Sequence, residues 1–156
     1  MRMRVQFKKT DSRAQTPRHG SRGAAGYDIG VLIDTAPEFL DDGYEMIAPM
    51  ETKFFRSGLA IELPPDHFAT LHARSSTLKK GLTVETSILD CDFRGEITIP
   101  VHNKSSNWVR IYDGEMLAQL VVSEYRTVIW EEVKELHDTE RGEGGFGSTD
   151  GKTITI

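Results

Sequence analysis

The chain has 156 residues, the length of a single domain that can bury a substantial core. Its formal net charge of −5 excludes the strongly basic surface of a typical nucleic-acid-binding protein. No run approaches the roughly 18 apolar residues that a membrane span requires. The basic start lacks the apolar region of a signal peptide, and Cys91, the only cysteine, excludes an intrachain disulfide. We expect a cytoplasmic protein, with the nucleus or an infected host cell as alternatives, that binds neither membrane nor nucleic acid.

Short segments with alternating or β-branched side chains lie between turn signals that recur about every ten residues. The strands expected from this pattern cover residues 4–7, 44–49, 59–64, 95–103, 107–112 and 116–122. In the fourth of them, Ile97, Ile99 and Val101 share one face of the strand. Many short strands with regular turn spacing predict an all-β sandwich or barrel.

One short helix is expected near the middle of the chain. Ser75 or Ser76 is a favoured N-cap residue, and Gly81 is a favoured stop. Arg74, just before the helix, would end a strand. A helix N-terminus combined with a guanidinium group and two hydroxyls suits a phosphate chain. The alternative is an ordinary serine cap beside a surface arginine.

Two carboxylates flank the cysteine in the segment Ile88–Ile97, ILDCDFRGEI. In a strand, Asp90 and Asp92 would face the same way, and one of them could activate a water molecule as a general base. Phe93 begins the turn that follows. A structural turn rich in Asp and Gly is the alternative reading.

Two further polar residues stand in apolar or extended surroundings. Asp28 follows an aromatic residue between glycines, and it could face Mg²⁺ through water because this ion keeps much of its hydration shell. Gln119 lies in an apolar run, so its amide needs a partner, either a ligand or the core. The single cysteine argues against a zinc site.

The chain ends in a glycine-rich segment, RGEGGFGSTDGKT, at residues 141–153. A P-loop is excluded because Phe146 stands where its first glycine is required, and because no helix can follow. Since the apolar pattern fades after His137, we expect a barrel domain over 1–137 and a flexible tail over 138–156. The tail is either solvated throughout or ordered only when a ligand arrives.

Five segments, AGYDI, ARSS, LDCDFRGEI, GEMLAQL and RGEGGFGST, together resemble the five motifs of the homotrimeric dUTPases in order and spacing. The likeness covers roughly residues 3–150. It implies a jelly-roll-like β barrel, a homotrimer with active sites shared between subunits, and a mobile C-terminal tail. It also implies hydrolysis of dUTP to dUMP and pyrophosphate, with Mg²⁺ on the triphosphate.

The resemblance assigns roles to individual residues of this chain. Asp90 matches the carboxylate that activates water for attack on the α-phosphorus. Phe93 matches the aromatic residue under the deoxyribose, which leaves no room for a 2′-hydroxyl, and Asp28 matches the carboxylate that binds the metal through water. Phe146 would stack on the base when the tail closes over a neighbouring site. The substrate-binding residues expected are Arg74, Ser75, Ser76, Thr86, Ser87, Leu89, Phe93, Gln119, Arg141, Phe146, Gly147, Ser148 and Thr149.

The chain departs from the family pattern mainly in the base-reading hairpin at residues 82–89. This segment is shorter than usual, and Ser87 stands where a glycine is expected. Glu85 could accept a hydrogen bond from the exocyclic amine of cytosine, so a pyrophosphatase that acts on dCTP as well as dUTP is one alternative. A nucleotide-dependent regulatory binding protein is another. A related dCTP deaminase is disfavoured because the strand at 96–103 has no suitably placed carboxylate.

Overall fold

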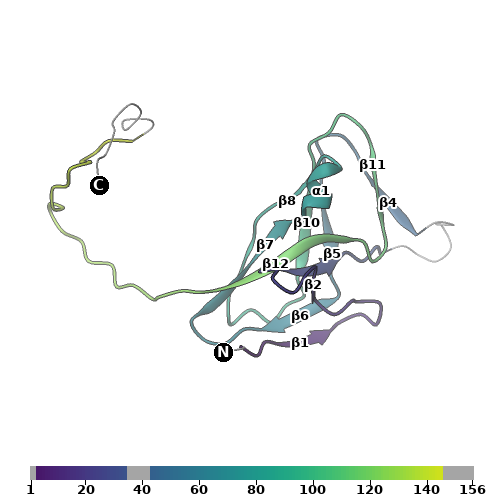
Figure 1. Cartoon of the computed structure of the whole chain (residues 1–156), viewed down its shortest axis with the longest axis horizontal. Helices are drawn as coiled ribbons and strands as arrows, with labels where there is room; N and C mark the ends of the chain where they lie inside the picture. Colours follow the sequence, from purple (N-terminus) through teal and green to yellow (C-terminus); the bar gives the residue numbers. More distant parts are fainter. Residues whose placement is uncertain (1–2, 35–42, 146–156) are drawn as a thin grey trace. The chain divides into compact units, whose positions relative to one another are not determined.

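The computed structural model describes residues 3–34 and 43–145 (Figure 1). Contacts within the chain divide it into two units, Met1–Arg126 and Thr127–Ile156. All regular strands and helices of the described residues lie in the first unit, and the last of them ends at Glu124. The domain boundary expected at residues 137–138 stays a prediction.

The first unit is built from short strands and a single short helix within its described residues. The strands are β1 (Gln6–Lys9), β2 (Arg18–His19), β3 (Tyr27–Gly30), β4 (Tyr44–Ile47), β5 (Thr52–Arg56), β6 (Leu59–Glu62), β7 (His67–Ala73), β8 (Leu82–Val84), β9 (Ile88–Leu89), β10 (Thr98–Asn103), β11 (Val109–Tyr112) and β12 (Met116–Glu124). The helix α1 covers Ser75–Lys79. This composition confirms the predicted all-β class. No helix of the described residues has the length and apolar character needed to cross a membrane.

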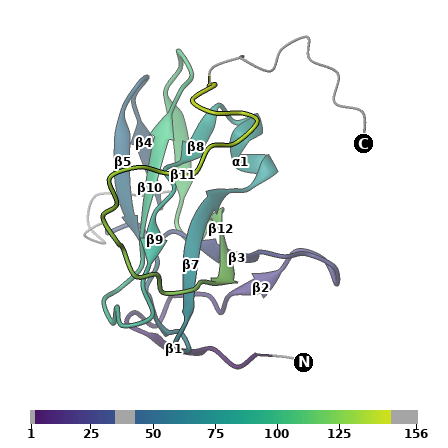
Figure 2. The same cartoon turned by 90° about the vertical axis from the view of Figure 1, so that its left-hand side faces the viewer.

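The strands pair antiparallel in four sheets. The largest has the order β2-β3-β12-β7-β9, a second has the order β5-β10-β8, and β1 pairs with β6 as β11 does with β4. Figure 2 shows β5 and β10 on one side of the first unit and β7, β12 and β3 on the other. The two larger sheets therefore present facing surfaces to each other.

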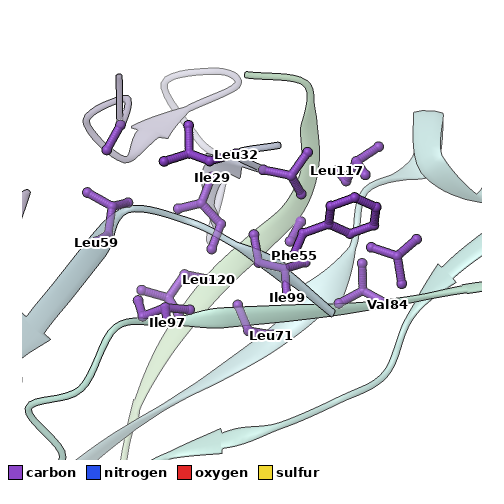
Figure 3. Packing of buried hydrophobic residues seen from close by; sticks show 14 of the residues in the cluster. Ile29, Leu32, Phe55, Leu59, Leu71, Val84, Ile97, Ile99, Leu117 and Leu120 are labelled. Atoms are coloured by element: carbon purple, nitrogen blue, oxygen red, sulfur yellow. The ribbon is translucent and has the colours of Figure 1, made fainter. Parts of the chain in front are cut away.

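Apolar side chains from both of these sheets form one core cluster (Figure 3). Ile97, just before β10, and Ile99 and Val101 of β10 are all fully buried. This confirms the predicted inward face of the strand expected at residues 95–103. Leu71 of β7 and Ile29 of β3 are equally buried on the opposite side. Each fully buried side chain of this size contributes about 1.5–3 kcal/mol, so the core holds the largest sheet rigidly in place.

Several strands were not expected from the sequence. β5 and β7 carry polar and aromatic residues without clean alternation, for example TKFFR in β5. Tertiary pairing forms these strands, since β5 pairs along β10 and β7 lies between β12 and β9. The position of β7 matters for function because two groups of candidate site residues lie beside it.

A network of polar side chains joins the N-terminal loop, Arg56 of β5 and Glu96, which lies just before β10. Arg13 donates to Asp11 (Nη2 to Oδ2, 3.0 Å), and Arg56 donates to Glu96 (Nε to Oε1, 3.1 Å). Hydrogen bonds from Arg13 lower the pKa of Asp11. Partial burial opposes ionisation of Glu96, but hydrogen bonds from Arg56, Thr10 and the Gly58 N–H outweigh it and lower the pKa of Glu96. The hydrogen bonds that Arg56 donates to Glu96 and to Asp34 raise the pKa of Arg56.

We expect this network to make the protein sensitive to acid. Because the folded state holds the pKa values of Asp11 and Glu96 below their ordinary values near 4, their ionisation stabilises the fold above that pH. The contribution is lost as the pH falls through the lowered pKa values. The Tm should therefore fall steeply below about pH 4, and the fall should be smaller in Arg56→Gln. Differential scanning calorimetry between pH 3 and 7 measures the Tm of both proteins.

Lys104→Gln is the control for this experiment because it removes an exposed positive charge elsewhere on the barrel. It should keep the wild-type dependence of Tm on pH. An equal drop in Tm on acidification for Arg56→Gln and the wild type would show that the network does not govern acid stability.

Candidate active site

Strand pairing brings Asp28, Gln119 and Arg74 together at one end of the largest sheet. Asp28 of β3 faces Gln119 of β12, and Gln119 faces His72 of β7 on its other side. Arg74 follows β7 directly, and its Nε lies 2.9 Å from Asp28 Oδ1 in an ion pair. Asp28 is a buried carboxylate, with its side chain 11% exposed. We call Asp28, Arg74, Ser75, Ser76 and Gln119 the β7–α1 cluster.

Two further hydrogen bonds orient the cluster. Arg74 Nη1 donates to the carbonyl oxygen of Met116 (2.9 Å), and Gln119 Nε2 donates to the carbonyl oxygen of Ala73 (3.1 Å). Gln119 is therefore a partly exposed amide whose donor is satisfied by the main chain. A Cβ at Gly26 would come within 2.5 Å of Gln119 Oε1, so glycine at this position leaves room for the amide in its observed orientation.

The helix begins one residue earlier than the predicted serine cap allows. Arg74, with extended backbone angles, is the N-cap residue of α1, and no side chain caps the helix. The prediction that Ser75 or Ser76 caps the helix is wrong. Both serines are exposed within the first turn. Thr77 anchors the helix instead by donating from Oγ1 to the carbonyl oxygen of Leu117 (2.7 Å). The two serine hydroxyls are thus left at the surface beside Arg74.

Gly81 ends the helical segment as predicted. Its φ of +76° lies in the left-handed region, which glycine adopts at little cost. Its N–H donates to the carbonyl oxygen of Leu78 (3.0 Å), which satisfies one of the last helical carbonyls.

Asp90 lies in a turn, which corrects the expectation that Asp90 and Asp92 share one face of a strand. β9 ends at Leu89, and the Phe93 N–H donates to the carbonyl oxygen of Asp90 (3.1 Å). Both carboxylates are exposed. Residues 91–95 lie outside the strands, between β9 and β10.

The ring of Phe93 is 41% exposed and packs against Gly95. A Cβ built on Gly95 would come within 2.5 Å of Phe93 Cζ, so only glycine leaves room for the ring in this position. The turn therefore presents a carboxylate, Asp90, and an aromatic surface to solvent together.

The sequence did not predict that Tyr125, just after β12, lies near Cys91 in the turn that follows Asp90. The neighbouring thiol of Cys91 raises the pKa of the Tyr125 hydroxyl, and the charges of Asp66 and Asp90 act in the same direction. The Tyr125 N–H donates to the carbonyl oxygen of Asp66 (2.9 Å). An isolated Tyr after an apolar strand carries no local signal for this contact, because Cys91 lies far away in the sequence.

The segment at residues 82–89 is not a two-stranded hairpin. β8 pairs with β10, whereas β9 pairs with β7, so the segment crosses from one sheet to another. The Glu85 N–H donates to the carbonyl oxygen of Pro100 (2.9 Å), and the Ser87 carbonyl accepts from the Leu71 N–H (3.2 Å). These two main-chain groups are therefore engaged within the fold. Thr86 and the Glu85 side chain are exposed between them.

One chain does not bring Asp90 and Arg74 together. Leu89 faces Ala69 of β7, so Asp90 lies near the start of that strand, whereas Arg74 follows its end. At 3.2–3.4 Å per strand residue, roughly 20 Å of β7 separates the two residues. Leu89 itself is buried in the core, so its side chain faces away from solvent. The candidate residues of the first unit thus form two separate groups.

The second unit contains the described part of the glycine-rich segment. Arg141 Nε donates to the carbonyl oxygen of Gly144 (2.9 Å), and Gly142 adopts a φ of +53°. Four predicted contacts, Phe146, Gly147, Ser148 and Thr149, lie outside the described residues.

A magnesium ion fits the β7–α1 cluster only through water. Among residues 3–34 and 43–145, no three His, Cys, Asp or Glu side chains gather into a metal-binding group. Asp28 provides one buried carboxylate, part of whose charge is balanced by Arg74. A single carboxylate suits an ion that keeps its water and takes its other oxygens from phosphates.

Comparisons with known proteins agree with this chemistry. The dUTPase family model matches residues 12–150. A deoxyuridine 5'-triphosphate nucleotidohydrolase from Hydrogenobaculum sp. is 39% identical over 150 residues, which cover 94% of this chain and 98% of that protein. A namesake from Thermobifida fusca is 35% identical over 153 residues, covering 96% and 80%. The structure of the Staphylococcus bacteriophage 80alpha dUTPase with dUPNHPP has a TM-score of 0.81 at 25% identity, covering 93% of this chain and 97% of that one. The chain belongs to the dUTPase family.

Proposed function

We infer that the protein hydrolyses dUTP to dUMP and pyrophosphate. The observation that carries this inference is the match to the dUTPase family over residues 12–150, nearly the whole chain. The exposed turn that carries both Asp90 and Phe93 supports it, since both side chains are accessible to a ligand.

Asp90 acts as the general base. Its carboxylate accepts a proton from a water molecule as the water oxygen bonds to the α-phosphorus. The bond from the α-phosphorus to the bridging oxygen breaks, and pyrophosphate leaves. A positioned base of this kind contributes about 10²–10⁴-fold to the rate. The Phe93 ring packs under the deoxyribose and excludes a 2′-hydroxyl.

The β7–α1 cluster binds the phosphates. Arg74 and the two serine hydroxyls donate to phosphate oxygens, and Gln119 lies beside them. Asp28 would hold Mg²⁺ through water, and the ion, bound to the triphosphate, would neutralise part of its charge. Asp28 also orients the Arg74 guanidinium through the ion pair.

The active form is a homotrimer with shared sites. The separation of roughly 20 Å along β7 between Asp90 and Arg74 supports this, because a dUTP molecule held by one of these groups needs the other group from a neighbouring subunit. Arg141 and the residues that follow it supply further contacts to the nucleotide of a neighbouring site, which exclude water from it.

Pyrophosphate release from dUTP, dCTP, dTTP and UTP in the presence of Mg²⁺ tests the function. We expect dUTP to be the preferred substrate by at least about 10²-fold, the scale of discrimination that a substrate pocket achieves. Comparable turnover of dCTP would show that the segment at 82–89 reads a different base. Glu85→Gln then tests whether that carboxylate accepts the cytosine amine. No release from any of the four would contradict the enzymatic function and favour a binding protein.

A further inference from the structure

We propose that Arg94 is a positioning residue that sets the selectivity for deoxyribose over ribose. It would do so by holding the Asp90–Gly95 turn in the shape that places the Phe93 ring. The inference rests on the proposed function, in which this ring packs under the sugar.

Arg94 binds the turn at two points and ties it to another strand. Its Nη1 donates to the carbonyl oxygens of Cys91 (2.6 Å) and Phe93 (3.0 Å), and its Nη2 donates to Glu62 Oε1 (3.2 Å) at the end of β6. One planar guanidinium therefore bridges two carbonyls of the turn and a carboxylate outside it. A lysine ammonium cannot reproduce this fork geometry.

The contacts are poorly suited to a purely stabilising role. The side chains of Arg94 and Glu62 are 52% and 56% exposed, and exposed ion pairs add little to stability. The effect of these contacts on the shape of the turn is larger than their effect on stability, because both carbonyls belong to the turn that carries Asp90 and Phe93. Arg94 thus restrains the local backbone without contributing to the core.

Gly95 supplies the second constraint on the ring. A Cβ on this residue would lie 2.5 Å from Phe93 Cζ and 2.8 Å from Cε2. The φ of Gly95 is outside the left-handed region, so its backbone does not itself require glycine. The missing side chain instead leaves room for the tip of the Phe93 ring. Arg94 fixes the turn, and Gly95 provides the surface on which the ring rests.

This arrangement predicts that a change at Arg94 alters the selectivity between dUTP and UTP rather than lowering the activity on both equally. The ring discriminates against a single oxygen atom, and a misplacement of about 1 Å can change a rate by on the order of 10²-fold. In Arg94→Gln, we expect the ratio of kcat/KM for dUTP to that for UTP to fall about tenfold or more, with little change in Tm. Gly95→Ala should lower the same ratio by displacing the ring directly. Arg94→Lys should fall between Arg94→Gln and the wild type.

The control is Arg110→Gln, which removes another exposed arginine, on β11. It should keep the wild-type ratio. An equal loss of kcat/KM for dUTP and UTP in Arg94→Gln would overturn the inference, because Arg94 would then act on the part common to both substrates. A lower Tm with an unchanged ratio would also overturn it and leave Arg94 a structural role only.

Binding measurements separate this inference from the proposed function. Calorimetric titration with dUPNHPP and its ribose counterpart gives the same selectivity ratio without turnover. If the wild type binds dUPNHPP more tightly but does not hydrolyse dUTP, the proposed function fails while the ratio in Arg94→Gln still tests the positioning role. An unchanged binding ratio in both Arg94→Gln and Gly95→Ala contradicts it.

Discussion

Asp90→Asn should reduce kcat for dUTP by about 10²–10⁴-fold, the contribution of a positioned general base. The amide keeps the size of the carboxylate but cannot accept a proton from water. Asp90 is exposed, and its main-chain carbonyl, which closes the turn with the Phe93 N–H, is unchanged by the substitution. The Tm should therefore stay close to that of the wild type. Single-turnover kinetics with dUTP measures the chemical step separately from product release.

Asp92→Asn is the matched control for this experiment. Asp92 lies in the same turn, is exposed, and carries the same charge. Its replacement should leave kcat within a few-fold of the wild type. If Asp92→Asn is as inactive as Asp90→Asn, the role of base cannot be assigned to Asp90. If both variants stay active, neither carboxylate activates the water.

Arg74→Gln should be nearly inactive alone but should regain activity when it is mixed with Asp90→Asn. Glutamine keeps a donor near Asp28 and the Met116 carbonyl but loses the charge that binds phosphate. If Asp90 and Arg74 of one site come from different subunits, mixed trimers contain some sites with both native residues. Random mixing at equal amounts would restore about a quarter of the wild-type activity.

The mixing experiment is done by unfolding the two variants together, refolding them and measuring pyrophosphate release. The mixture of the two variants without subunit exchange is the control and should stay inactive. No recovery after demonstrated exchange would contradict shared sites, because each site would then take both residues from one chain. Recovery would exclude a complete site within a single subunit.

Local chemistry made much of the fold predictable. The alternation of Ile97, Ile99 and Val101 predicted the inward face of β10, and the structure buries all three. The helix stop at Gly81 was also predictable, since a positive φ there requires the residue that the sequence supplies. Both features depend only on residues a few positions apart in the chain, so a local sequence pattern is enough to predict them.

The predictions that are wrong concern segments whose structure is decided by partners distant in the sequence. The resemblance to the family implied a hairpin at residues 82–89. In the structure, β8 pairs with β10 and β9 pairs with β7, so the two strands belong to different sheets. The prediction of a serine cap is wrong for a similar reason. β7 carries its extended backbone up to Arg74, so the helix starts at Ser75 and leaves both serine hydroxyls exposed.

Short motifs in the sequence are enough to assign the chain to the dUTPase family, and the roles that they give to single residues stay predictions. The sequence could not show that Arg94 bridges the Asp90 turn and Glu62, since these residues meet only in space. Nor could it show that Asp90 and Arg74 lie apart. That separation was decided by the register of β7 against β9, and an extended strand holds its two ends at a distance that no side chain can span.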